Sequence, residues 1–214
     1  MIEVLRDNLE GKMENRNDPR NVFSAMHHRV TGELLHLMDG FYSNIEDGLF
    51  ELAFRNDDAD QRTRCFDLMR EMRYRRGGLI QTFAKRMQRA GEGWLDEDRN
   101  PARVPELTMI AQQMSDKCSA HFSTLLQQVT ERTSYGTDRA VSPADLPISP
   151  YHIAYHFIAS CQSLEFDNQA IEIVQDLFAR FVLDRLGAVY GECNQRLEAA
   201  GFYTQAELDM VNSA

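Results

Sequence analysis

Apolar side chains return every three or four positions along most of this chain, which is the spacing of one face of an α-helix. Between Asp18 and Asn56 they form one continuous stripe, at Phe23, Met26, Val30, Leu34, Met38, Phe41, Ile45, Leu49 and Leu52. Asp18 provides an N-cap for this helix, and Pro19 suits its first turn. No segment alternates between apolar and polar residues with the β-branched enrichment typical of a strand. The pattern therefore predicts an all-α fold, a helical bundle with no sheet.

A second stripe follows at once and predicts a helical hairpin. It extends from about Asp60 to Ala90 through Phe66, Met69, Met72, Ile80, Phe83 and Met87. The polar run 56–60 ends the first helix and begins the second, so a tight turn joins them. Gly77 and Gly78 have low helix propensity and predict a kink in the second helix. We expect a long hairpin over residues 18–94.

Residues 104–214 predict the bundle part of the fold. Helices are expected over 105–134, from Pro150 to near Glu165 with Ser149 as the N-cap, and from Asp167 or Asn168 to Ala200. Irregular segments are expected at 95–106 and 137–150, where prolines gather, although Ser142 and Pro143 can begin one short turn.

The chain is expected to end in a short helix, and to form one domain. Gly201 is a natural helix stop, and Thr204 with Glu207 has the spacing of a capping box for that last helix. A chain of 214 residues is long enough to bury a complete core. We expect residues 1–214 to form a single all-helical domain.

The second helix of the hairpin carries a strongly basic run in an acidic protein. From Arg62 to Arg89 it holds nine basic and two acidic residues, whereas the whole chain has a net charge of −10. Arginine binds carboxylates and phosphates through a fixed two-pronged geometry. The candidate partner-binding residues are Arg62, Arg70, Arg73, Arg75, Arg76 and Arg86.

Two other interpretations of the basic run stay open. The arginines can pair with acidic residues of the same hairpin, or they can form a solvated face. The acidic candidates are Glu46, Asp47, Glu51, Asp57 and Asp58. A nucleic-acid partner is disfavoured by the net charge, which repels phosphate backbones.

The sequence offers little for metal or nucleophilic chemistry. The chain has one Glu-x-x-His motif, Glu33 to His36, whereas a di-iron bundle needs two. His152 and His156 lie four positions apart on one helical face, but two ligands do not complete a metal site. No nucleophile, phosphate-loop or dinucleotide motif is present. We therefore expect no metal, no cofactor and no enzymatic activity. The four cysteines show no zinc or redox spacing and are expected in the core.

The amino-terminal segment predicts a cytoplasmic protein. It has no basic stretch followed by an apolar run, as a secretory signal would have. No uncharged apolar stretch approaches the ~20 residues that span a bilayer. We expect no membrane partner.

The chain also resembles a family of uncharacterised proteobacterial proteins. The stretch EDGLFELAFRNDDADQRTRCFDLMREMRYRRGG, from Glu46, is similar to that family's "DALFELAE" and "YFDAMRELRRKR" segments. The second half, LPISP followed by DLFARFVLDRLGAVYGECNQRLEAAG, resembles its "NPLGP" and "LYKLFDRHVLSRLGDLYDELNRLLVEAG" segments. The resemblance covers about Asp39 to Phe202 and implies a compact version of the amino-terminal region of longer members.

The resemblance implies no reaction, ligand or catalytic residue. Some members carry the label thymidine phosphorylase, but that enzyme class needs a large α/β domain, which this helical chain does not supply. We therefore expect a regulatory or scaffold protein that acts by protein–protein binding through its Arg-rich helix. The alternative is a nucleotide or nucleic-acid binding regulator that uses the same helix. Exposed outer turns of the hairpin also favour a homodimer or a stable partner.

Overall fold

A computed structural model describes residues 18–55, 57–95, 104–164 and 168–212. Within these residues every regular element is a helix and no strand is present, which confirms the predicted all-α fold. The elements are α2 (Pro19–Arg55), α3 (Ala59–Gly91), α4 (Pro105–Ser119), η1 (Ala120–Phe122), α5 (Ser123–Thr137), η2 (Pro143–Asp145), α6 (Pro150–Cys161), α7 (Asn168–Phe181), η3 (Leu183–Arg185), α8 (Leu186–Ala199) and α9 (Gln205–Asn212).

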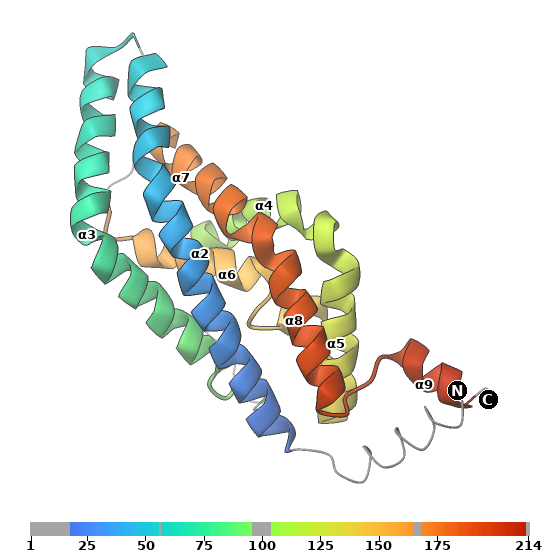
Figure 1. The fold of residues 1–214 in the computed structure, drawn as a ribbon. Coiled ribbons are helices and arrows are strands. Elements are labelled where there is room, and N and C mark those ends of the chain that lie inside the picture. The colour runs from blue at the N-terminus through green and yellow to red at the C-terminus, as the bar shows by residue number, and fades with distance from the viewer. Residues whose placement is uncertain (1–17, 56, 96–103, 165–167, 213–214) are drawn as a thin grey trace.

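The long amino-terminal hairpin is confirmed. Figure 1 shows α2 and α3 side by side, with their joined end extending beyond the remaining helices. Asp18 accepts a hydrogen bond from the backbone N–H of Arg20 at 3.0 Å, and Asp58 caps α3 in the same way through Asp60. The α3 hydrogen-bond ladder continues through Gly77 and Gly78, and the helix changes direction near its middle (Figure 1).

Two of the predicted long helices are each broken into two, so those predictions were wrong. Residues 105–134 form α4 and α5 separated by η1, and residues 168–200 form α7 and α8 separated by η3. The breaks redirect the chain, because α4 packs mainly on α6 whereas α5 packs on α8, and α7 packs on α2. Phe122 and Leu183, inside the two breaks, are buried at 4% and 0% exposure.

The predicted caps of the later elements are confirmed. Ser149 accepts a hydrogen bond from the backbone N–H of His152 at 3.4 Å and begins α6. That helix ends at Cys161, earlier than predicted; Glu165 lies outside the described residues. Ser142 and Asp145 form a capping box for the short helix η2.

Aromatic side chains from the hairpin and the bundle meet in the core. Phe157 of α6 and Phe178 of α7 stack with ring centroids 3.7 Å apart, and Phe41 of α2 contacts both rings edge-on. All three are almost fully buried. The four cysteines are also buried, which confirms that they belong to the core: Cys65, Cys118, Cys161 and Cys193.

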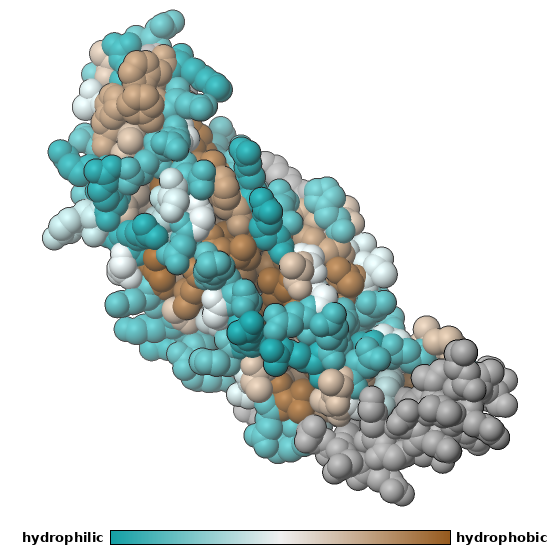
Figure 2. All heavy atoms as spheres, in the orientation of Figure 1, coloured by the Kyte–Doolittle hydropathy of each residue, from teal (hydrophilic) through white to brown (hydrophobic). Residues whose placement is uncertain are grey.

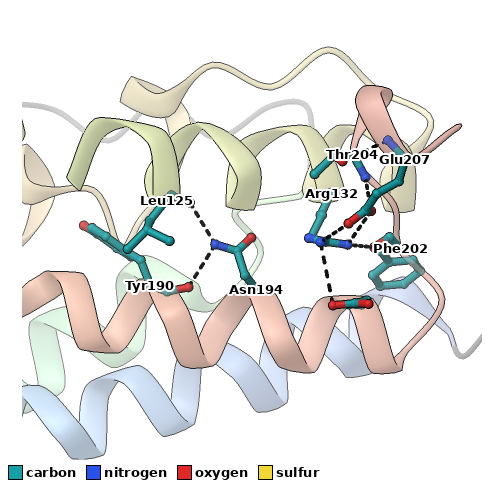
Figure 3. A network of polar contacts seen from close by, with 8 residues as sticks. Leu125, Arg132, Tyr190, Asn194, Phe202, Thr204 and Glu207 are labelled. Atoms are coloured by element: carbon teal, nitrogen blue, oxygen red, sulfur yellow. Dashed lines mark hydrogen bonds and ion pairs between the residues drawn. The ribbon is translucent and has the colours of Figure 1, made fainter. Parts of the chain in front are cut away.

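A buried arginine fixes the last helix to the bundle (Figure 3). Gly201 ends the preceding turn with φ 86°, a left-handed conformation that glycine adopts without strain. Arg132 of α5, whose side chain is 5% exposed, then donates to both carboxylate oxygens of Glu207 and to the carbonyl oxygen of Phe202. Glu207 also accepts from the backbone N–H of Thr204 at 2.9 Å. The same carboxylate therefore closes the predicted capping box of α9 and pairs with the buried guanidinium group of Arg132.

Candidate functional site

The arginines singled out in the sequence lie along α3, and two of them bridge to α2. Arg73 donates its Nε–H to Glu46 Oε1 at 2.9 Å and makes a second contact with the other carboxylate oxygen. This pairing lowers the pKa of Glu46. Arg76 pairs with Asp39 at 2.8 Å and lies over the ring of Tyr42. These two pairs tie the helices of the hairpin together.

Two further arginines pair within α3 itself. Arg70 contacts Asp67 at 2.9 Å, and Arg75 contacts Glu71 at 2.7 Å. The guanidinium groups are solvent-accessible, so each pair contributes little to stability. The structure therefore shows arginines of α3 paired with acidic residues of the same hairpin, an interpretation that the sequence left open. Of the four partners described above, Glu46 was among the acidic residues expected, whereas Asp39, Asp67 and Glu71 were not.

A surface groove lies where the middle of α3 passes the end of α6. It has a volume of about 650 Å³. The groove is lined by Tyr74, Arg75, Gly78, Leu79, Thr82, Arg86, Ala159, Ser160, Gln162 and Ser163. None of these lining residues is acidic, although the chain as a whole is.

Two of the six candidate arginines thus lie in one groove. Arg75 crosses it and donates to the carbonyl oxygen of Ser163 at 3.1 Å. The Nε of Arg86 is shielded from solvent and has no hydrogen-bond partner within the described residues. A shielded donor without an acceptor is costly in a folded protein, and an acceptor reaches this Nε only when the Arg86 side chain moves.

The aromatic ring of the groove is almost fully exposed. Tyr74 has 86% of its surface in solvent, whereas Leu79 beneath the groove is 4% exposed. Tyrosine and arginine are, with tryptophan, the residue types enriched among the positions that contribute most to binding energy at protein interfaces. The groove therefore combines an aromatic contact, two guanidinium groups and hydroxyl or amide groups that can orient an anionic partner.

The sequence did not predict this groove. Ser160, Gln162 and Ser163 carry no binding motif, and they meet α3 only because α6 ends at Cys161 beside it. Arg62 and Arg70 were grouped with the other arginines, but they lie nearer the free end of the hairpin and do not line the groove.

The other sequence candidates form no additional site. His152 and His156 have ring centroids 6.5 Å apart, and Nδ1 of His152 lies 2.7 Å from the carbonyl oxygen of Leu146. Glu33 pairs with Arg29. Across the part of the chain that the structure describes, no three His, Cys, Asp or Glu side chains gather in a way that can hold a metal ion.

Three of the four cysteines lack the environment of a nucleophile. Burial raises the pKa of Cys161 and of Cys193 to about 12, and that of Cys118 to about 11. A catalytic thiol needs the opposite shift, toward the thiolate. These thiols pack as apolar groups.

Among the described helices, none combines the length and the apolar character that a membrane span requires.

Comparison with known proteins identifies a family but no characterised relative. No curated protein and no solved structure matches the chain. The sequence model of one family, "Protein of unknown function (DUF1631) N-terminal domain", matches residues 18–201. This range includes the hairpin, the groove and the bundle through α8. The chain therefore belongs to this family of uncharacterised domains.

Proposed function

We propose that this protein is a non-enzymatic regulatory or scaffold module that binds an acidic segment of a partner protein in the α3–α6 groove. The observation that carries the proposal is the groove lining, which presents Tyr74, Arg75 and Arg86 and, among the residues that the structure describes, no acidic one. Arg73 and Arg76 extend the cationic surface along α3, and they also tie the hairpin together.

The spacing of the two groove arginines favours a peptide segment over a single phosphate group. Arg75 and Arg86 are eleven positions apart on one helix, which corresponds to about 16 Å along its axis. Two arginines whose backbone positions lie that far apart suit separate anionic groups better than a single one. They suit two carboxylates spaced along a segment, with Tyr74 as the aromatic contact between protein surfaces.

The environment of each arginine supports binding. Arg86 lines the groove with a partly exposed side chain. The contact of Arg75 with Glu71 is solvent-accessible and weak, so an incoming carboxylate can replace it at little cost. The net charge of −10 repels any anionic partner, and it disfavours a nucleic acid more than a short acidic segment, because a nucleic acid carries a phosphate at every nucleotide.

The same guanidinium groups suit phosphate, so a nucleotide or nucleic acid is the alternative ligand. This ligand would have to overcome the acidic surroundings. Nuclease treatment and absorbance at 260 nm of the purified complex distinguish it from a protein partner.

We place this activity in the bacterial cytoplasm. The four buried cysteines form no disulfide, which is typical of proteins from reducing compartments. The resemblance to proteobacterial proteins supports a bacterial source. The expected homodimer would use a different surface, the free end of the hairpin.

The proposal is tested by capture from nuclease-treated lysate of the source organism. Wild-type protein should retain a stoichiometric protein partner, and Arg86→Glu should reduce its recovery at least tenfold. Lys85→Glu is the matched control, because Lys85 is the adjacent, exposed residue of the same helix and does not line the groove.

Circular dichroism and the urea midpoint should be unchanged in both variants. Equal loss with Lys85→Glu would show a nonspecific charge effect and contradict the proposal. Retention of the partner by Arg86→Glu would also contradict it.

A further inference from the structure

Three phenylalanines are exposed at the free end of the hairpin. Phe50 and Phe54 on α2 and Phe66 on α3 are 47%, 71% and 44% exposed. Their rings contact one another, with centroids 4.6 Å apart for Phe50–Phe54 and 6.3 Å for Phe50–Phe66. Figure 2 shows an apolar patch at this end of the molecule. We call these three residues the aromatic patch. A contiguous exposed patch of large aromatic side chains marks an interaction surface.

The hairpin does not need this patch to hold itself together. Leu49, Ala53 and Cys65 are buried at 5% exposure or less at the same end. Gly48 of α2 lies against α7, where a Cβ at this position would be 2.8 Å from Cδ1 of Leu177. Beyond that point the hairpin extends past the other described helices (Figure 1). The aromatic patch is therefore exposed surface in addition to the buried contacts that hold the two helices of the hairpin together.

Charges of opposite sign flank the patch on its two helices. On α2, Glu46 and Asp47 lie four and three positions before Phe50, on the same face; Glu46 is held by Arg73 of the same hairpin, whereas Asp47 is exposed. On α3, Arg62 and Arg70 lie four positions either side of Phe66, also on its face. One helix thus presents carboxylates beside the patch, and the other presents guanidinium groups.

We infer that the aromatic patch is a homodimer interface that receives the same patch of a second copy of this chain. A two-fold axis places α2 of one copy opposite α3 of the other, because each surface meets itself in a two-fold dimer. The acidic residues beside Phe50 in each copy then face the arginines beside Phe66 in the other copy, so this contact between opposite charges occurs twice. A nucleic acid or a uniformly acidic protein would instead be repelled by the acidic residues of α2 beside the patch.

The ion pair that Arg70 makes within its own chain can be replaced by one across the dimer interface. The Arg70 side chain is 78% exposed and contacts Asp67 within its own helix. Such exposed pairs contribute little, so Arg70 can turn to a carboxylate of the second copy. This inference uses other residues than the groove and does not depend on the proposed function.

Sedimentation velocity of the full chain, over a range of concentrations in ~0.15 M salt, tests the inference. Wild type should sediment as a dimer of the 24.6 kDa chain. The double variant Phe54→Ser/Phe66→Ser should raise the dimer dissociation constant at least ~100-fold, with unchanged circular dichroism. Tyr74→Ser is the matched control, because it removes an exposed aromatic from the groove and should leave the dimer intact.

A charge swap then identifies the second copy as the partner. Asp47→Arg and Arg70→Glu should each be monomeric alone, because like charges meet twice in either homodimer. An equimolar mixture of the two variants should form a heterodimer, since each contact then joins opposite charges. A wild-type monomer at all concentrations, a dimer unaffected by the phenylalanine changes, or a mixture that stays monomeric would overturn the inference.

Discussion

The imidazole of His27 occupies the space that a side chain at residue 91 would need. A Cβ at Gly91 would lie 2.0 Å from Cδ2 of His27 and 2.4 Å from its Nε2. The ring lies there because Nε2 donates to the carbonyl oxygen of Met87 at 2.7 Å. This contact joins the beginning of α2 to the end of α3, far from the tight turn that connects them.

Gly91→Ala should destabilise the protein by about 1–3 kcal/mol, the usual cost of forcing atoms into a packed site. The added methyl must displace the His27 ring and break its hydrogen bond. Urea unfolding followed by circular dichroism measures the change.

Gly78→Ala is the matched control for this effect. A Cβ at Gly78 meets nothing within 4 Å, so the higher helix propensity of alanine should stabilise α3 by about 0.5–1 kcal/mol. A Gly91→Ala variant as stable as Gly78→Ala would contradict the steric account.

Stability should fall as the pH drops from about 7.5 to about 5.5, because burial lowers the pKa of His27 below its ordinary value of 6.5. Below pH 6.5 the unfolded chain binds a proton at this residue while the folded chain does not. Protonation therefore favours the unfolded state, and the stabilisation present above pH 6.5 is lost on acidification. The nearby charges are His28, which reinforces the shift, and Glu92, which opposes it.

Urea midpoints at several pH values measure this dependence. His27→Gln should be less stable at neutral pH and show a flatter pH profile, because it removes the titrating group. His28→Gln changes an exposed histidine and should keep most of the pH dependence, because burial is the largest cause of the His27 shift and the charge of His28 is a smaller one. The carboxylates with lowered pKa values, such as Glu46 and Glu192, titrate below this pH range and do not interfere. An unchanged slope in His27→Gln would refute the assignment.

Glu207→Gln should destabilise the fold by about 3 kcal/mol, because it leaves the buried Arg132 charge without its carboxylate. The same change weakens the capping box of α9. Glu198→Gln is the control, since this exposed carboxylate lies 3.9 Å from Arg132 and should contribute under about 1 kcal/mol. Thermal unfolding of the two variants tests the difference. Equal effects would show that Glu207 is not the residue that stabilises the buried charge of Arg132.

Much of the fold could be predicted because apolar spacing and caps are local signals. The Asp18 cap, the hairpin turn, the Ser149 cap and the Thr204–Glu207 capping box all depend on residues a few positions apart. The breaks at η1 and η3 could not be predicted in this way. A three-residue 3₁₀ turn has nearly the helical repeat, so the apolar stripe continues in phase across it.

The candidate sites depended on contacts that sequence order does not reveal. The basic run of α3 was visible, but its division into hairpin pairs such as Arg73–Glu46 and groove residues such as Arg86 follows from which helix each turn faces. The carbonyl oxygen of Ser163, 88 positions from Arg75, is one example of such a distant partner. Aromatic exposure at Phe54 likewise follows from the length of the hairpin beyond the bundle.

Photo-cross-linking from the groove in living cells tests the central claim most directly. With p-benzoylphenylalanine in place of Tyr74, whose ring is exposed beside the groove arginines, irradiation should give one protein adduct whose cross-linked peptide is rich in Asp and Glu. Adding Arg86→Glu should abolish the adduct, and adding Lys85→Glu should not. An adduct to nucleic acid, no adduct at all, or an adduct that persists with Arg86→Glu would contradict the proposal that this groove binds an acidic protein segment.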